Sequence, residues 1–117
     1  MLMEQNTIRI EVNVWDANCP SRALLDLIAD KWSALVIVKL SDGAVRYGRL
    51  HREIGGISHK MLSQTLHNLE RRSLVKRAVH DTVPPQVEYR LTEQGRSLLV
   101  PLAGLIEWAE THVNELS

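Results

Sequence analysis

Hydrogen-bonding side chains gather in the segment 57–70, whose sequence is ISHKMLSQTLHNLE. On a helix, Leu62, Leu66 and Leu69 recur at i, i+4 and i+7 and form an apolar stripe. Hydroxyl, imidazole, ammonium and amide groups occupy other positions, namely Ser58, His59, Lys60, Ser63, Gln64 and His67. No acidic residue interrupts them before Glu70. This pattern favours a negatively charged partner with patterned hydrogen-bonding edges, although a solvated helix face has a similar composition.

The single cysteine, Cys19, is the other position with chemistry of its own. It precedes Pro20, which is typical of the first position of a helix, so Cys19 is expected at the N-cap. Free N–H groups and the helix dipole favour a thiolate there, and Arg22 lies one turn further on. Such a thiolate reacts with quinones, aldehydes and peroxides. Alternatively, Cys19 is a small apolar residue buried in the protein. Because the chain has one cysteine, any disulfide would have to join two chains.

Charge is distributed unevenly along a chain of 117 residues whose net charge is zero. Between Arg46 and Arg90, nine basic residues stand against four acidic ones, a net charge of +5 that leaves −5 for the rest. A basic middle between acidic ends is typical of a protein that binds a polyanion through one face. The basic side chains expected to contact phosphates are Arg46, Arg49, His67, Lys76, Arg77 and Arg90. Solubility is the alternative role for each of them.

Four helices are expected in the first two thirds of the chain. The first begins at Pro20, the second spans KWSALVIVKL and ends at Asp42-Gly43, and the third carries Tyr47, Leu50 and Ile54. A brief extended piece, AVR, precedes the third helix. Gly55-Gly56 then leads into the fourth helix, with Ser58 as its N-cap. Helix, glycine turn and helix form a helix-turn-helix, whose second helix can enter the DNA major groove.

Strand patterns flank this helical region. Residues 7–15, TIRIEVNVW, alternate strictly and predict a strand, while LVKRAV and VEYRLT predict a β-hairpin with a tip stiffened by two prolines. Arg77 shares the strand parity of Val75 and Val79, which favours a place in the sheet. Thr92 is expected to cap one long last helix, kinked at Pro101. The order predicts a mainly α winged helix-turn-helix with a small β-hairpin.

The phrases in this order resemble the HxlR-type transcriptional regulators, relatives of the MarR-type winged-helix proteins. They are CP at 19–20, DKW at 30–32, L.DG..R from Leu40, GISHKMLSQTL.NLE from Gly56, LV.R at 74–77, VPPQVEYRLTE.G.SL from Val83, and Trp108. The resemblance implies a bacterial homodimer that binds double-stranded DNA, regulates neighbouring genes and often responds to electrophiles or oxidants. The chain departs from the pattern in YGRLHREIGG, where the family more often has a Phe, an acidic residue and Pro-Gly.

The helix-turn-helix assigns roles to the polar residues of segment 57–70. The side chains expected to face bases are His59, Lys60, Ser63 and Gln64, with Lys suited to guanine and Gln to adenine. His67 is expected at a phosphate, and Ser58 as a cap. The hairpin tip, near residues 81–86, would follow the adjacent minor groove, although it lacks an arginine.

Apolar residues of the first and last helices predict a homodimer. The expected interface contains Leu24, Leu27, Ile28, Leu98, Leu102, Leu105, Ile106, Ala109 and Val113. A twofold dimer places two recognition helices about 34 Å apart, which matches a pseudo-palindromic operator. Residues 1–18 are expected to form an arm that reinforces this contact, and residues 19–117 the DNA-binding domain. Trp32, Tyr89 and Trp108 are expected in the core, unless the tryptophans line a pocket for a small-molecule inducer.

Other classes of protein fit less well. The sequence shows no Gly-rich phosphate loop and no nucleophile paired with a base, so no catalytic residue and no enzyme is expected. The five histidines lack metal-ligand spacing, so neither a metal nor another cofactor is expected. No apolar run is long enough to span a membrane, which favours the cytoplasm. A winged helix that binds only proteins remains the alternative to a DNA-binding regulator.

Overall fold

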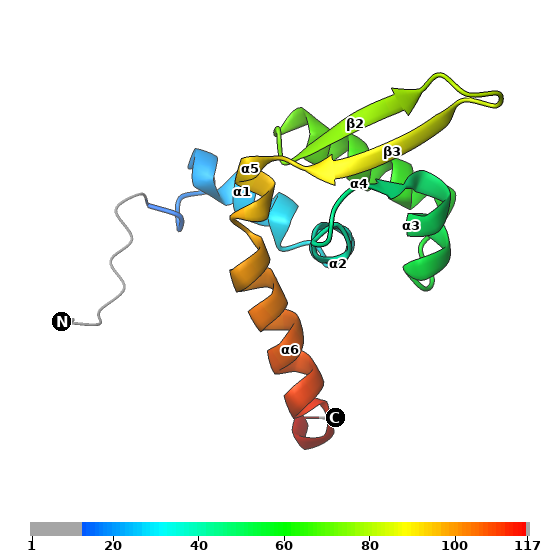
Figure 1. Cartoon of the computed structure of the whole chain (residues 1–117). Coiled ribbons are helices and arrows are strands. Elements are labelled where there is room, and N and C mark those ends of the chain that lie inside the picture. The colour runs from blue at the N-terminus through cyan, green and yellow to red at the C-terminus, as the bar shows by residue number, and fades with distance from the viewer. Residues whose placement is uncertain (1–12, 117) are drawn as a thin grey trace.

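The computed structural model describes residues 13–116, which form six helices and a three-stranded sheet (Figure 1). The elements in chain order are α1 (Pro20–Ile28), α2 (Lys31–Lys39), β1 (Val45–Arg46), α3 (Tyr47–Glu53), α4 (His59–Arg71), β2 (Val75–His80), β3 (Gln86–Leu91), α5 (Glu93–Arg96) and α6 (Leu99–Leu116). This order confirms the predicted winged helix-turn-helix: α3 and α4 are its two helices, and the β2–β3 hairpin is the wing. None of the helices in the described part of the chain is long and apolar enough to cross a membrane.

Side-chain caps fix where several helices begin. The Asp30 carboxylate accepts hydrogen bonds from the backbone N–H groups of Trp32 and Ser33 at the start of α2. The Ser58 hydroxyl accepts one from Met61 N–H at 3.0 Å, which confirms the predicted cap of α4. Each cap satisfies donors that the first helical turn leaves without a partner and contributes about 1 kcal/mol.

The three strands form an antiparallel sheet in the order β1-β3-β2. β2 and β3 pair from Val75 opposite Leu91 to His80 opposite Gln86. The short strand β1 pairs with the other edge of β3, with Val45 opposite Tyr89. The predicted hairpin is therefore confirmed, and the extended piece before α3 becomes its third strand. Because α3 follows β1 directly, this pairing holds the start of α3 beneath the wing.

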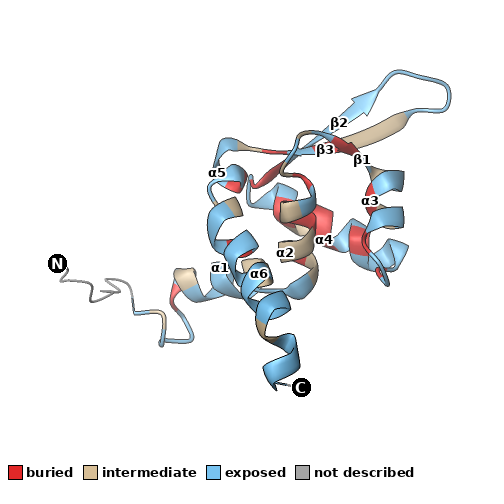
Figure 2. Ribbon diagram, turned by 60° about the horizontal axis from the view of Figure 1, so that its bottom comes forward, coloured by how far each residue is buried: buried red, intermediate tan, exposed pale blue. Residues whose placement is uncertain are grey.

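The core lies between α2, α4 and the inner face of the sheet (Figure 2). The predicted apolar stripe of α4 is fully covered, with Leu62, Leu66 and Leu69 no more than 1% exposed. Burial of each leucine contributes about 2 kcal/mol from the hydrophobic effect. α4 is therefore fixed in rotation about its axis, and its polar side faces outward.

The last helix differs from the prediction, because α5 and α6 are separate helices. The Thr92 hydroxyl caps α5 at Gly95 N–H and also bonds to the Ser73 carbonyl, 19 residues earlier, so α5 is tied to the start of the wing. The predicted kink at Pro101 is replaced by a break at residues 97–98, because a proline can neither bond to the carbonyl four residues earlier nor avoid crowding it. This proline lies in the first turn of α6, where an N–H group has no intrahelical acceptor, so proline costs little there.

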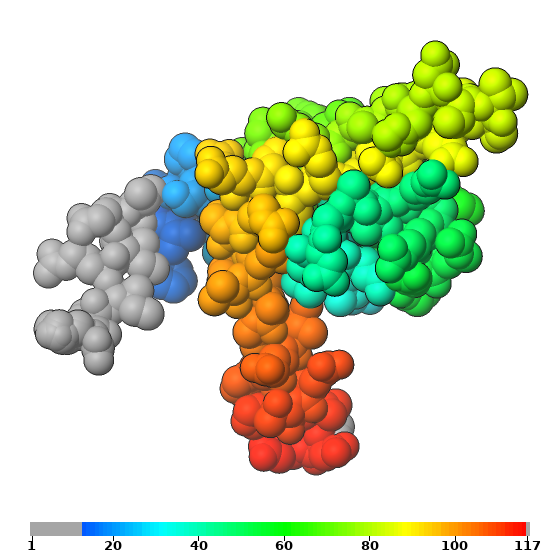
Figure 3. Space-filling view, in the orientation of Figure 1, coloured from blue at the N-terminus to red at the C-terminus, as the bar shows by residue number. Residues whose placement is uncertain are grey.

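Two other expectations need correction or fall outside the structure. The predicted strand at residues 7–15 lies outside the described residues as far as residue 12, and Val14 and Trp15 form a turn in which Asp16 N–H bonds to the Asn13 carbonyl. Trp108 is not in the core, because 52% of it is exposed on the part of α6 that projects from the body (Figure 3). Tyr89 is buried as predicted, and Trp32 is half-buried against the core.

Candidate nucleic-acid interface

The outward side of α4 carries the residues predicted to face bases. His59, Lys60, Ser63 and Gln64 are all exposed, and so is His67 one turn further along. The turn between α3 and α4 contains Gly56 with φ of +83°, a left-handed conformation that favours glycine. Together with burial of Ile57, this turn sets α4 across α3 and leaves the first turns of α4 open to a partner.

Tyr47, at the start of α3, contacts the recognition side of α4. Its hydroxyl lies 3.1 Å from Nδ1 of His59 and 3.0 Å from Oγ of Ser63, and it donates to the main-chain carbonyl of His59 at 3.2 Å. A carbonyl can only accept, so all three contacts are satisfied together when His59 and Ser63 donate to the Tyr47 oxygen. In that arrangement a neutral His59 ring has Nε2 as a hydrogen-bond acceptor.

A second residue of α3, His51, also fixes His59. The two imidazole rings stack with centroids 3.6 Å apart and planes inclined by 7°. His59 is therefore held by Tyr47 on its Nδ1 edge and by His51 on its ring face. Neither Tyr47 nor His51 was among the predicted contact residues. The tyrosine hydroxyl had a sequence signal, because YGRLHREIGG departs from the usual family pattern.

Lys60 and Gln64 differ from their neighbours His59 and Ser63. Their side chains make no hydrogen bond or ion pair with any other residue in the range 13–116. The recognition side of α4 thus combines two side chains held by α3, His59 and Ser63, with two long side chains that are free to move, Lys60 and Gln64. This combination can present a fixed hydrogen-bonding pattern and still adjust to a base edge.

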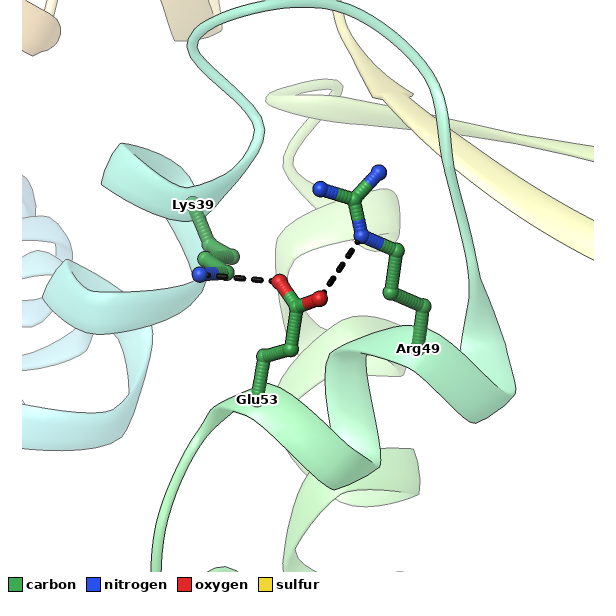
Figure 4. Close-up of polar contacts among 3 residues, drawn as sticks. All are labelled: Lys39, Arg49 and Glu53. Atoms are coloured by element: carbon green, nitrogen blue, oxygen red, sulfur yellow. Dashed lines mark hydrogen bonds and ion pairs between the residues drawn. The ribbon is translucent and has the colours of Figure 1, made fainter.

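The predicted phosphate contacts lie in different environments. Arg49 is ion-paired, since its Nε is 2.9 Å from Oε2 of Glu53, and Nζ of Lys39 is 2.9 Å from Oε1 of the same carboxylate (Figure 4). The hydrogen bonds from Lys39 and, next, from Arg49 hold the pKa of Glu53 below its ordinary 4.5. Glu53 therefore links α3 to α2 through Lys39, and it also engages Arg49 within α3.

The basic residues of the wing point to its two faces. Lys76 and Arg90 are register partners on one face, and both are exposed. Arg77 is the register partner of Tyr89 on the other face, together with Val75 and Val79 as its parity predicted. Burial raises the pKa of the Tyr89 phenol above 10.0, and the Arg77 guanidinium acts in the opposite direction. Arg77 therefore lies on the underside of the wing.

Cys19 lies at the N-cap of α1, as predicted, and only 9% of it is exposed. It makes no side-chain cap to the helix. The guanidinium of Arg22 donates to the main-chain carbonyl of Trp15 at 3.2 Å. Arg22 thus has a partner of its own in the turn that precedes the cysteine. The cysteine belongs to the turn before α1 and lies outside the helix-turn-helix.

The residues predicted for a dimer interface fall into two groups. Leu102 is buried in the core of the protomer, and Leu27, Ile28, Leu98 and Ile106 are half-buried. Leu24, Leu105, Ala109 and Val113 are exposed, with 61% of Leu105 and 53% of Val113 open to solvent. The apolar stripe of α6 is thus covered at its start and uncovered where the helix leaves the body.

Comparison with known proteins places the chain in a family. Residues 27–117 match the HxlR-like helix-turn-helix family. The HTH-type transcriptional regulator YtfH of Escherichia coli (strain K12) is 39% identical over 106 residues, which cover 91% of this chain and 84% of YtfH. The solved structure of ytfH from Salmonella typhimurium superposes with a TM-score of 0.85 at 38% identity, covering 91% of this chain and 95% of that one. The redox regulator HypR in its oxidized form has a TM-score of 0.73 at 38% identity, covering 80% of this chain and 96% of HypR. The chain belongs to the HxlR-like helix-turn-helix family of transcriptional regulators.

Proposed function

We propose that this protein is a homodimeric transcriptional regulator that binds a pseudo-palindromic DNA operator through α4. The observation that carries the proposal is the two-sided character of α4. Its leucine stripe is fully buried, while its opposite side holds hydrogen-bonding groups with no acid from Ser58 to Leu69. A polyanion with patterned groove edges is the partner that such a surface fits.

Base recognition is assigned to His59, Lys60, Ser63 and Gln64. Lys60 can donate to O6 and N7 of guanine, and the amide of Gln64 can pair with N6 and N7 of adenine. His59 and Ser63, held by Tyr47, present fixed groups at the start of the helix. Fixed groups lose less conformational entropy on binding, which favours discrimination between sequences.

Phosphate binding is assigned to the basic residues around α4. His67 lies on α4 itself, Arg46 precedes α3, and Lys76 and Arg90 extend along the outer face of the wing. Arg49 and Arg77 complete the predicted set, although Arg49 must share its charge with Glu53. Each such contact adds affinity and salt dependence without sequence information.

Dimerisation is assigned to the exposed apolar residues of α1 and α6. Leu24, Leu105, Ala109 and Val113 lie outside the protomer's core, and together with the half-buried Leu27 and Ile28 they offer apolar surface on both helices to a second copy. A twofold axis there would place the two α4 helices about 34 Å apart.

The test is a titration of labelled DNA from upstream of the protein's own gene, at two salt concentrations. Parent protein is expected to bind one palindromic fragment tightly and with strong salt dependence. Gln64→Ala should weaken operator binding by about tenfold, because a good bidentate base contact contributes 1–3 kcal/mol, and Lys60→Ala should behave alike. Gln94→Ala, which removes an exposed amide from α5, is the matched control. Unchanged binding by both α4 variants would refute the base-reading assignment.

We further propose that Cys19 senses oxidants. Two observations support this role: its place at the N-cap of α1, and the similarity of the chain to the redox regulator HypR. Diamide would oxidise the Cys19 thiols of two chains to a disulfide and would itself be reduced to the hydrazine by the two electrons and two protons released. Operator binding should then change on diamide treatment and recover with dithiothreitol. An identical response in Cys19→Ser would remove the sensor role.

A further inference from the structure

The hydroxyl of Tyr47 determines the hydrogen-bonding character of two base-facing side chains on α4. It lies 3.2 Å from the main-chain carbonyl oxygen of His59, 3.1 Å from Nδ1 of His59 and 3.0 Å from Oγ of Ser63. Two oxygens this close repel each other unless a hydrogen atom lies between them, and of the phenol and the carbonyl only the phenol carries one. The single Tyr47 proton therefore points to the carbonyl.

The other two contacts must then use the lone pairs of the Tyr47 oxygen. Nδ1 of His59 and the hydroxyl of Ser63 each donate a hydrogen atom to it. A neutral imidazole that is protonated on Nδ1 has a lone pair on Nε2. A hydroxyl whose proton is already used offers a partner only its oxygen lone pairs. Toward DNA, both side chains are thus hydrogen-bond acceptors.

The ring of His59 is also held against rotation by half a turn. Such a flip would place a C–H group against the Tyr47 oxygen in place of Nδ1, and the hydrogen bond would be lost. The His51 ring stacks on the imidazole at a centroid distance of 3.6 Å, so the ring plane is fixed as well. Nε2 makes no hydrogen bond with any of residues 13–116, and His59 is exposed. Its lone pair is therefore available to a partner.

Acceptors on a recognition helix select particular base edges. The donors in the major groove are exocyclic amino groups, N6 of adenine and N4 of cytosine, whereas guanine and thymine offer only acceptors and a methyl group there. His59 and Ser63 are four residues apart, so they lie on the same side of α4, one turn from each other. Lys60, by contrast, carries only donors and suits guanine. Neighbouring positions of α4 therefore have opposite preferences.

We propose that Tyr47 makes His59 and Ser63 readers of exocyclic amino groups, so that the bases facing them are adenine or cytosine and not guanine or thymine. The inference rests on the proposed function, because it names the bases that face the DNA-binding side of α4. Tyr47 is a positioning residue in this scheme. Its hydroxyl is fully used within the protein, and it determines which atoms of His59 and Ser63 carry hydrogen.

The first experiment observes the ring hydrogens of His59 in the whole chain without DNA. Long-range nitrogen–proton NMR correlations of isotope-labelled histidine are recorded at about pH 8, where imidazole is neutral. We expect Nδ1 of His59 to be protonated in the parent, and the ring to shift toward the Nε2–H form in Tyr47→Phe. His67, whose ring makes no hydrogen bond among residues 13–116, is the reference for an unconstrained imidazole. An Nε2–H ring of His59 in the parent would refute the inference.

The second experiment removes single groups from operator bases and measures binding by titration. Deoxynebularine replaces adenine without its N6 amino group, 2-pyrimidinone replaces cytosine without its N4 amino group, and 7-deazapurines keep the amino group but lack the N7 acceptor. The base facing His59 is the one whose substitution has no effect in His59→Ala, and Ser63→Ala locates the base facing Ser63 in the same way.

At these two bases, loss of the amino group should weaken operator binding by about threefold to tenfold, the usual worth of one hydrogen bond. Loss of N7 should have no effect there. A penalty for the 7-deazapurine in place of the amino-group penalty would show that His59 or Ser63 donates, and would refute the inference. It would be refuted equally if no base became insensitive in His59→Ala.

Tyr47→Phe links the two experiments. Without the hydroxyl, His59 can take either ring form, so the amino-group penalty at its base should fall to about twofold or less. Tyr89→Phe, which alters the other tyrosine of the chain, is the matched control and should keep the parent's penalty. An unchanged penalty in Tyr47→Phe would refute the role of the hydroxyl.

Failure of this inference is distinguishable from failure of the proposed function. A parent protein that binds no operator refutes the proposed function and the base assignment together, and the NMR experiment then still decides whether Tyr47 controls the ring hydrogens of His59. Operator binding that is tight but insensitive to loss of the amino groups refutes this inference alone.

Discussion

At the scale of single residues, removal of the Tyr47 hydroxyl tests whether this group positions the base-reading side chains of α4. Tyr47→Phe removes one hydroxyl that contacts both His59 and Ser63, and it leaves the aromatic ring. Operator affinity should fall by about twofold to tenfold, the usual worth of one or two hydrogen bonds. Affinity for unrelated DNA should stay unchanged, because no phosphate contact is lost. The measurement is the ratio of the two affinities in parallel titrations.

The matched control for this substitution is Tyr89→Phe, which alters the other tyrosine of the chain. Tyr89 lies in β3 and makes no hydrogen bond to α4 within the described residues. Its specificity ratio should equal that of the parent. If Tyr47→Phe also keeps the parent's ratio, the hydroxyl does not position base-reading groups.

Glu53 provides a pH-dependent prediction at the same scale. Hydrogen bonds from Lys39 and Arg49 hold its pKa below 4.5, so the folded state favours the carboxylate more than the unfolded chain does. The stabilisation is present above the ordinary pKa of 4.5 and is lost as pH falls through the lower folded value. Since the group is exposed, the effect is small. Urea unfolding of parent and Glu53→Gln should therefore differ near neutral pH and converge in acid, and a constant difference would contradict the assignment.

At the scale of elements, periodicity and capping made the first four helices predictable. The apolar positions of α4 follow the helical repeat, and Ser58 and Thr92 are strong caps, so local sequence determines both where these elements begin and which face they bury. The break between α5 and α6 falls at residues 97–98, just before Pro101, so this proline was its sequence signal. The tie between Thr92 and Ser73 was not predictable, because its two partners lie 19 positions apart. The role of Tyr47 was not predictable either, because its hydrogen-bond partners, His59 and Ser63, lie on the next helix.

Gly95 illustrates how tightly α5 is held. A Cβ atom there would lie 2.1 Å from the Leu74 carbonyl oxygen, which belongs to the backbone and cannot rotate away. Gly95→Ala should destabilise the protein by about 3 kcal/mol, the upper range for overpacking. Gly104→Ala is the matched control, because no atom lies within 4 Å of its Cβ site. That variant should be stabilised by about 0.5–1 kcal/mol from helix propensity. Urea unfolding at one fixed protein concentration checks both, and equal stabilities would show that α5 is free to shift.

At the scale of the whole molecule, charge and apolar surface are separated. The basic segment forms the helix-turn-helix and the wing, whereas the exposed apolar residues lie on α1 and on the projecting half of α6 (Figure 1). One end of the protomer therefore suits a polyanion and the other suits a second protomer. This separation was predictable from the charge count and the apolar stripes. The degree of exposure along α6 was not, because it depends on where the helix leaves the body.

The last prediction is that loss of the dimer contact on α6 weakens DNA binding by α4. Leu105→Glu combined with Val113→Glu places two charges on the exposed stripe of α6 without touching the core. The variant should sediment as a monomer and bind the operator at least about a hundredfold more weakly, because each half-site loses the benefit of a linked partner. Thr111→Glu adds one charge on the opposite side of α6 and should remain dimeric. A dimeric double variant with full operator affinity would move the interface away from α6, and the spacing of the two recognition helices would then have to be set by another surface.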